Sequence, residues 1–323
     1  MGVAVEYLFP VAGVRHAYAV GSADDRRHVA NDENRGLMLG ETQIREHRIG
    51  RIVPNDPAKT TGLCVLAVQG RLVKPITRRF FEEAGIAAGM HVLDVGSGAG
   101  DVSFLVADLV GETGHVVGVD RADDAVATAS ERAAALALDH VCSFEQGELA
   151  DLVFKHRFDA IVGRYVLMFQ PDPAEALRSL LQHVEPDGLV VFHEPEWTRA
   201  RSVPAVPSWQ RCCDLVVATA TANGVDMEMG MKLAGLFEHV GLPAPSLRMS
   251  TVIGAGANCS DVVHFTADVL MTVLAQAQQA GLVEAGEIDP ATYAERLIAD
   301  VRESGSVVIG RAEVGAWSHR IVG

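Results

Sequence analysis

HVLDVGSGAG, at residues 91–100, is the stretch that decides the fold of this chain. Its first residues are a short apolar run, which is typical of a buried parallel strand. The residues that follow it, DVSFLVADLV at 101–110, have helical spacing. The glycines between the two permit positive φ angles and let a ligand lie against bare backbone. The stretch therefore predicts a strand, a ligand-binding turn and a helix.

The same alternation continues along the chain. Further strands are predicted at 115–120, 143–147, 158–164 and 189–194, with helices at 122–138 and 173–184 between them. Strands that alternate with helices indicate an α/β fold with a parallel sheet and helices on both faces. A helical pattern at 65–85, which we expect Pro75 to split, precedes the sheet, and a late pair of strands is predicted at 247–254 and 306–317.

Two parts of the chain differ from this pattern. Residues 1–64 mix Gly, His, Arg and Asp without a clear period, and we interpret them as a poorly packed N-terminal extension with no assigned function. Residues 65–323 are predicted to form one domain. It contains helical insertions at about 200–230 and 258–305, which we expect to lie over the carboxyl edge of the sheet as a lid.

Composition narrows the function. Lys and Arg number 27 against 42 Asp and Glu, a net charge of −15, which disfavours nucleic acid as a partner. The sequence has no apolar run of membrane-spanning length and no signal peptide pattern, so we expect a cytoplasmic protein without a membrane partner. The five cysteines form no C-x-x-C pair, and we expect neither a disulfide framework nor a metal.

The glycine turn itself leaves two cofactor classes to weigh. A dinucleotide site has G-x-G-x-x-G, whereas this chain has D-x-G-x-G-x-G from Asp94 to Gly100. A carboxylate at the mouth of the turn would repel a pyrophosphate and would suit a ligand that carries an ammonium and a sulfonium. Asp120, at the end of the next strand, could accept hydrogen bonds from ribose hydroxyls in either class, so it does not discriminate.

Several stretches together resemble the class I S-adenosylmethionine-dependent methyltransferases: HVLDVGSGAG, VVGVD, FEQGELADL, FDAIVGRYVLMFQPDPAEALRSL and PDGLVVFHEPEW. The resemblance is strong over residues 65–200 and weaker through GAWSHR near the end. It implies a Rossmann-like, doubly wound sheet of seven mostly parallel strands with the last strand antiparallel. It also implies S-adenosyl-L-methionine as the cofactor.

The resemblance further implies a cofactor site. Asp94 would hold the loop and face the methionine amino group, and Asp120 would bind the ribose hydroxyls. The loop residues that would line the methionine and ribose are Gly96, Ser97, Gly98 and Gly100. The other implied contacts are Arg121 against the adenine, Glu148 and Leu149 at the adenine edge, Arg164 through its carbonyl near the methionine amine, and Gln69 and Arg71 on the preceding helix.

Methyl transfer is an in-line displacement in which positioning does most of the work and a general base is optional. Glu194 and His193 are the candidate catalytic residues, because they stand at the carboxyl end of the fifth predicted strand. The candidate acceptor-binding residues are Tyr165, Phe169, Trp197 and His264.

The residues after the fourth strand read GRYV and lack the Asn/Asp-Pro-Pro-aromatic motif of enzymes that methylate amide or adenine amino groups. We therefore expect a small, partly apolar metabolite as acceptor. The alternatives are an NAD(P)-dependent oxidoreductase on a similar sheet and a non-catalytic regulatory protein that binds the cofactor. The Ala- and Leu-rich insertion fits either a lid or the contact face of a homodimer.

Overall fold

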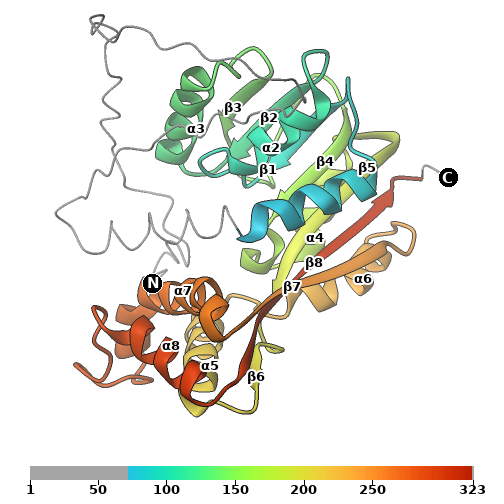
Figure 1. Cartoon of the computed structure of the whole chain (residues 1–323). Coiled ribbons are helices and arrows are strands. Elements are labelled where there is room, and N and C mark those ends of the chain that lie inside the picture. The colour runs from blue at the N-terminus through green and yellow to red at the C-terminus, as the bar shows by residue number, and fades with distance from the viewer. Residues whose placement is uncertain (1–71, 322–323) are drawn as a thin grey trace, which may run out of the picture.

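The computed structural model describes residues 72–321, and the fold is the expected mixed α/β sheet with helices on both faces (Figure 1). The extension predicted at 1–64 and the two candidate residues Gln69 and Arg71 lie outside the described residues. A helix over residues 72–84 precedes the sheet and ends at Gly85, whose φ of 104° suits only glycine. This helix runs through Pro75, so the predicted split is wrong between residues 72 and 84.

The remaining elements follow in chain order. The strands are β1 His91–Val95, β2 His115–Asp120, β3 Cys142–Gln146, β4 Phe158–Arg164, β5 Val184–Glu196, β6 Arg201–Val203, β7 Ser246–Ala255 and β8 Val307–His319. The helices are α2 Asp101–Val110, α3 Asp123–Ala135, α4 Pro173–Leu181, α5 Pro207–Ala222, α6 Met229–His239, α7 Ser260–Gln279 and α8 Tyr293–Glu303, with short 3₁₀ turns η1 Leu167–Phe169 and η2 Gly256–Cys259.

The strand order is β3-β2-β1-β4-β5-β8-β6, and β7 also pairs with β8. Strands β1 to β5 are parallel to their neighbours, and β8 is antiparallel to β5, as the resemblance implied. Within residues 72–321 the sheet has eight strands and not the expected seven. The additional strand is β6, which pairs with the end of β8 that starts at Val307.

Helices cover both faces of the sheet with apolar side chains. On one face Phe80 and Phe81 of the 72–84 helix pack in a cluster with Leu105 of α2. On the other face Leu177 of α4 and Phe237 of α6 belong to a second cluster. The first turn of α4 is capped by the side chain of Asp172, which accepts from the N–H groups of Ala174 and Glu175. The central strands β1 and β4 are buried along most of their length, which explains why they are nearly continuous apolar runs in the sequence.

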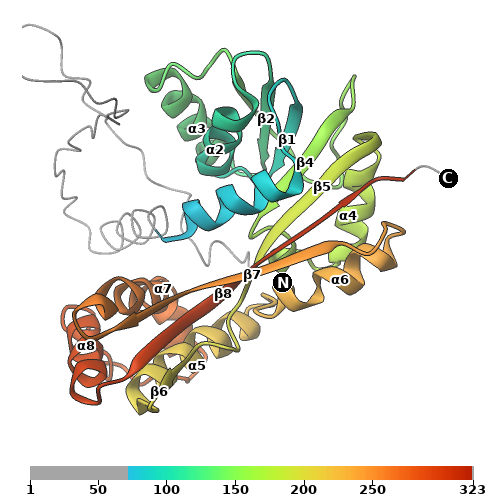
Figure 2. The same cartoon turned by 45° about the vertical axis from the view of Figure 1, so that its right-hand side comes forward.

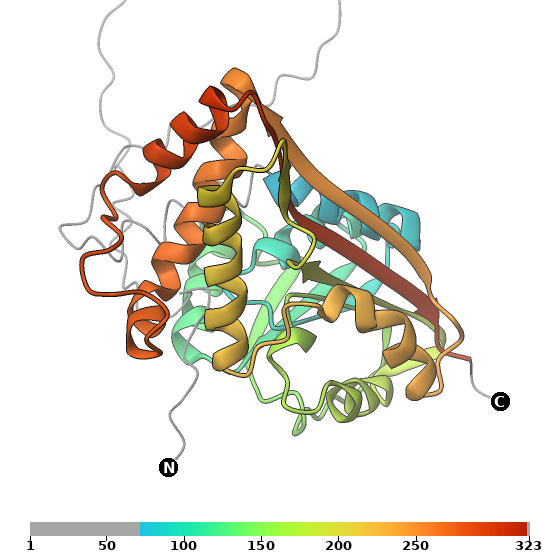
Figure 3. The same ribbon diagram turned by 90° about the horizontal axis from the view of Figure 1, so that it is seen from below.

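Helices α5, α7 and α8 form a separate lobe beside β6, where β7 and β8 extend away from the rest of the sheet (Figures 1 and 2). They fall within the segments 200–230 and 258–305, where helical insertions are predicted, and the role of these segments as a lid stays a prediction. The last paired residue of β5, Glu196, lies opposite Ala312, so residues 307–311 of β8 continue beyond the carboxyl end of β5. Seen from below in Figure 3, the three helices lie side by side. No helix within residues 72–321 is long and apolar enough to cross a membrane.

Candidate functional site

The loop between β1 and α2 is built from glycines in the left-handed region. Gly96, Gly98 and Gly100 have φ angles of 64°, 53° and 88°. A Cβ added at Gly96 would lie 2.7 Å from Cγ2 of Val166, so this position tolerates no side chain unless Val166 moves. The loop therefore presents bare backbone at the carboxyl end of β1, where ligands bind in sheets of this kind.

Asp94 and Ser97 leave two buried polar atoms unsatisfied in this loop. The Asp94 side chain is completely buried, and its Oδ2 accepts a hydrogen bond of 2.5 Å from the Ser103 hydroxyl. Neither Oδ1 of Asp94 nor Oγ of Ser97 has a partner within residues 72–321. Burial raises the pKa of Asp94 to about 7. Because an unpaired buried polar atom costs about 1–3 kcal/mol, these two atoms indicate a polar ligand at the loop.

Asp120 ties the end of β2 to the same loop. Its Oδ2 accepts from the N–H of Gly98 at 2.9 Å, and its Oδ1 accepts from the N–H of Ala122 at 3.0 Å. The backbone oxygen of Asp120 accepts from the N–H of Gly147 at 3.0 Å. A carboxylate oxygen can accept two hydrogen bonds, so Asp120 keeps the capacity to bind hydroxyl groups while it holds the loop.

The residues expected at the adenine lie next to Asp120, at the ends of β2 and β3. Arg121 and Glu148 are exposed and Leu149 is half-buried. The carbonyl of Arg121 accepts from the side-chain amide of Gln146, whose Cα pairs with that of Asp120 across the strands. The structure thus brings these residues to the same edge of the sheet as the glycine loop, and their contacts with a cofactor stay a prediction.

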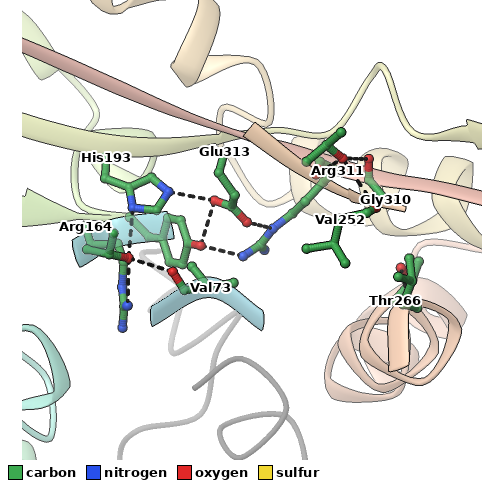
Figure 4. A network of polar contacts seen from close by, with 12 residues as sticks. Val73, Arg164, His193, Val252, Thr266, Gly310, Arg311 and Glu313 are labelled. Carbon is green, nitrogen blue, oxygen red and sulfur yellow. Dashed lines mark hydrogen bonds and ion pairs between the residues drawn. The ribbon is translucent and has the colours of Figure 1, made fainter. Parts of the chain in front are cut away.

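A buried polar network lies at the junction of β4, β5 and β8 (Figure 4). Nε of Arg311 donates to Oε1 of Glu313 at 2.8 Å, and the Glu313 Oε2 accepts from the Tyr165 hydroxyl at 2.8 Å. Figure 4 shows the Glu313 carboxylate between the guanidinium of Arg311 and the imidazole of His193. Although burial opposes it, the Arg311 charge holds the pKa of Glu313 down to about 2.

His193 is a fully buried member of this network, so it is not exposed to a methyl acceptor. Its Nε2 lies 2.9 Å from Oε2 of Glu313 and its Nδ1 lies 3.2 Å from the Thr77 hydroxyl. The ionised Glu313 can only accept, so Nε2 carries the proton and faces the carboxylate. Burial lowers the pKa of His193. These contacts give His193 a structural position and do not support its predicted catalytic role.

Glu194 also differs from its predicted role. The side chain is completely buried, and Oε1 accepts from the N–H groups of Val166 and Leu167 at 2.9 and 2.8 Å. Oε2 accepts from the N–H of Met168 at 3.4 Å. Burial raises the pKa of Glu194 to about 8, against these three donors, which lower it. Glu194 therefore holds the start of η1, and its oxygens face backbone N–H groups and not a methyl acceptor.

Two of the candidate acceptor-binding residues lie together around Arg311. The guanidinium carbon of Arg311 is 4.8 Å from the ring centre of Tyr165 and 5.2 Å from that of Trp197. Trp197 is buried, and its Nε1 has no partner in the described part of the chain. Phe169, at the end of η1, is half-buried. Tyr165 has a φ of 59°, which is unusual for a residue with a side chain and is often found at functional sites.

His264 does not join this group. Its Nε2 lies 3.3 Å from a carboxylate oxygen of Glu295 on α8, at a half-exposed position within the helical lobe. The next residue on α7, Phe265, is the one that faces the network, with its ring centre 4.8 Å from the Arg311 guanidinium carbon. The residue of α7 that contacts Arg311 is therefore Phe265, which follows the predicted His264.

Arg164 connects the network to the glycine loop. It is the last residue of β4, and its Nη1 donates to the Thr77 hydroxyl at 3.3 Å. Its positive charge lowers the pKa of Asp94, in opposition to the larger effect of burial. The resemblance implies only the carbonyl of Arg164 at the cofactor, and the contact of its side chain with Thr77 depends on the fold.

Thr77, Arg311 and Glu313 were also missed. The signal for the last two is present in the sequence: Arg and Glu stand two residues apart in an apolar strand, which places both on one face. A charged pair in a strand that is otherwise apolar indicates a buried ion pair. Thr77 gives no such signal, because a hydroxyl on a helix is common at the surface.

A family model described as a methyltransferase domain matches residues 86–239. The 2-phytyl-1,4-naphtoquinone methyltransferase of Synechococcus elongatus is 38% identical over 111 residues, which are 33% of this chain and 48% of that protein. The aklanonic acid methyltransferase DauC of a Streptomyces species is 29% identical over 133 residues, 41% of this chain and 60% of that protein. The arsenite methyltransferase of Aquipseudomonas alcaligenes is 29% identical over 166 residues, 45% of this chain and 48% of that protein.

The chain spans about half the length of the curated relatives it matches. Among solved structures, a protein of Bacillus halodurans C-125 aligns with a TM-score of 0.53 at 16% identity, covering 76% of this chain and 99% of that one. The YcgJ protein of Bacillus subtilis aligns with a TM-score of 0.51 at 16% identity, covering 76% and 98%. These two likenesses show the fold. The match of the family model to residues 86–239 agrees with the resemblance found in the sequence: this segment is similar to methyltransferase domains.

Proposed function

We propose that this chain transfers a methyl group from S-adenosyl-L-methionine to a small, partly apolar acceptor. The observation that carries the proposal is Asp94, whose buried Oδ1 is unpaired within the described residues and lies beside a loop of three left-handed glycines. A buried carboxylate without a partner suits the ammonium group of the cofactor and would repel a pyrophosphate.

The residues present fit the cofactor at two further points. The Ser97 hydroxyl is buried and also lacks a partner in the described part of the structure, so it can bind a polar group of the methionine. Asp120 keeps spare acceptor capacity for ribose hydroxyls. When bound, S-adenosyl-L-methionine supplies a methyl carbon on a sulfonium: the acceptor's electron pair forms the new bond to that carbon as the carbon–sulfur bond breaks.

The chain's own contribution is then to orient two ligands and to exclude water. His193 and Glu194 are engaged with Glu313 and with backbone N–H groups, so neither is placed to take a proton from the acceptor. We therefore assign the rate enhancement to positioning, which can supply on the order of 7–11 kcal/mol.

Donor binding tests the proposal directly. Isothermal titration of the purified chain with S-adenosyl-L-methionine and with S-adenosyl-L-homocysteine should give micromolar binding. Asp120→Ala should weaken it severely, because the loop loses its Gly98 anchor and the ribose loses its acceptor. Tight binding of NADH with no binding of either nucleoside would contradict the proposal and favour the oxidoreductase alternative.

The acceptor class needs a separate experiment. The relatives are named for a phytyl naphthoquinone, aklanonic acid and arsenite. We propose a reduced quinone or another hydroxylated aromatic compound, because the relative that is 38% identical over 111 residues is named for a naphthoquinone. A panel with these three classes, scored by formation of S-adenosyl-L-homocysteine, should give turnover with the aromatic compounds. Donor binding with no turnover on any of them would favour the regulatory alternative. The cytoplasmic location and the homodimer remain predictions.

A further inference from the structure

Arg311 and Glu313 are two charged residues in the interior of β8. Their exposed fractions are 4% and 2%, and Nε of Arg311 donates to Oε1 of Glu313 at 2.8 Å. A buried ion pair is weak evidence for stability, because apolar residues of similar volume often stabilise a protein as well or better. The role of this ion pair must therefore follow from the other residues that Arg311 and Glu313 contact.

Both members of the pair bind the same hydroxyl group. The phenolic O–H of Tyr165 donates to Oε2 of Glu313 at 2.8 Å, and the phenolic oxygen accepts from Nη2 of Arg311 at 2.7 Å. The guanidinium carbon of Arg311 also lies 4.8 Å from the centre of the Tyr165 ring. Hydrogen bonds to charged partners are the stronger ones, and two of them on one oxygen hold the ring in a single orientation.

The backbone of Tyr165 is also constrained. Its φ of 59° is a left-handed conformation, which is unfavourable for residues other than glycine. Its N–H donates to the carbonyl of His193 at 2.9 Å, and Glu194 accepts from the N–H groups of the next two residues. The turn that follows β4 is thus held by its side chain on one side and by Glu194 on the other.

This turn forms a wall of the glycine loop. Val166 follows Tyr165, is buried, and places Cγ2 where a Cβ on Gly96 would be only 2.7 Å away. A change in the orientation of Tyr165 would therefore shift Val166 against Gly96, the first glycine of the loop.

We propose that Arg311 and Glu313 are positioning residues for the donor site, which fix Tyr165 so that Val166 stays packed against Gly96. The same guanidinium lies 4.8 Å from the ring centre of Phe265 on α7, so the pair also links the helical lobe to the loop. The inference rests on the proposed function, because it takes the glycine loop to be the donor site.

The first test is Tyr165→Phe, which removes the hydroxyl and keeps the ring. We expect the Kd for S-adenosyl-L-methionine, measured by isothermal titration, to rise about tenfold, because the loss of hydrogen bonds to two charged groups frees the ring. The matched control is Tyr293→Phe, which removes a tyrosine hydroxyl in the helical lobe, and its Kd should stay within about twofold of the wild-type value.

A double-mutant cycle separates positioning from a general loss of stability. Val166→Ala should weaken donor binding although the charged network stays intact. If Tyr165 acts through Val166, the two substitutions together should raise the Kd by clearly less than the product of their separate effects. Arg311→Lys, which keeps the charge, should retain more donor affinity than Arg311→Met.

The outcomes distinguish the two proposals. A wild-type chain that binds neither S-adenosyl-L-methionine nor S-adenosyl-L-homocysteine would overturn the proposed function and this inference with it. Wild-type binding combined with an unchanged Kd for folded Tyr165→Phe would overturn the inference alone. If Tyr165→Phe does not fold, Val166→Ala decides: a raised Kd supports the inference, and an unchanged Kd overturns it.

Discussion

At the scale of single residues, the buried carboxyl groups of Asp94, Glu313 and Glu194 differ in pKa because different groups surround them. Asp94 has an unpaired oxygen and a pKa raised by burial to about 7. Glu313 lies beside Arg311, which brings its pKa down to about 2 although burial opposes this. Glu194 accepts hydrogen bonds from three backbone N–H groups, and burial raises its pKa to about 8. The first suits ligand binding, whereas the other two hold the structure in place.

The raised pKa of Asp94 predicts a pH dependence of donor binding. Below pH 7 the carboxyl group is mostly protonated, and an ammonium ligand must displace that proton to form an ion pair. The Kd for S-adenosyl-L-methionine should therefore rise as pH falls, by up to about tenfold for each pH unit below 7. Titration calorimetry in buffers of different ionisation enthalpy should also detect the released proton.

Asp94→Asn is the control for that experiment. It has nearly the same shape but no titrating group, so its donor affinity should be weaker and nearly independent of pH in this range. A wild-type Kd that stays constant from pH 5.5 to 7 would show that Asp94 does not meet the ammonium.

Glu194 supports a prediction about stability. Glu194→Ala leaves the buried N–H groups of Val166, Leu167 and Met168 without their acceptor, and should lower the free energy of unfolding by about 2–5 kcal/mol. Glu194→Gln keeps one oxygen acceptor and should lose much less. Urea denaturation of both variants measures the difference, and equal losses would argue against the structural role.

At the scale of elements, the loop from β1 to α2 depends on glycine for two separate reasons. Gly96→Ala adds a Cβ to a residue with a positive φ of 64°, and this Cβ would clash with Val166. It should destabilise the protein by about 1–3 kcal/mol and abolish measurable donor binding.

Gly224, just after α5, separates these two reasons. Its φ is 78°, but a Cβ there would meet nothing within 4 Å. Gly224→Ala should therefore lower stability by about 1 kcal/mol and leave the donor Kd unchanged. Thermal denaturation and calorimetry of the two variants provide the comparison. A Gly96→Ala variant that binds the donor normally would show that Val166 adjusts easily.

The elements that could be predicted from sequence are those with a local signal. The apolar run before Gly96 and the helical spacing after Gly100 give β1 and α2, and the regular alternation that follows gives the strands up to β5. The helices of the lobe were also placed correctly, because long helices carry their period within one segment. The turn glycines and Asp120 could be predicted from the same local pattern.

The features that could not be predicted depend on residues far apart in the chain. β6 has only three residues and becomes a strand by pairing with β8, about a hundred residues later. Glu194 reads as an exposed acid at a strand end, and only the fold shows that the N–H groups of η1 surround it. His193 and Glu313 meet across β5 and β8, a pairing that no local pattern contains.

At the scale of the whole molecule, β8 is the element that joins the two parts. One half pairs with β5 in the main sheet, and the other half pairs with β6 beside the helical lobe, while β7 runs along both halves (Figure 2). It also carries Arg311 and Glu313. The main sheet and the lobe therefore share one strand, and each should need it to be stable.

A truncated chain tests this dependence. Ending the chain at Ser306 removes β8, exposes the edges of β5 and β7, and should abolish both cooperative thermal unfolding and donor binding. Ending it at Arg320 removes only residues after β8 and should change neither. Cooperative unfolding with donor binding in the Ser306 form would show that the main sheet folds without its central antiparallel strand.

The position of β8 has a consequence during protein synthesis. Of the described strands it is translated last, yet it lies inside the sheet between β5 and β7. The nascent chain must therefore wait on the ribosome with two open strand edges until these 13 residues emerge, which takes about a second at typical elongation rates. Until β8 is present, the edges of β5 and β7 can pair with other polypeptides, so chaperones should matter most while β8 is absent.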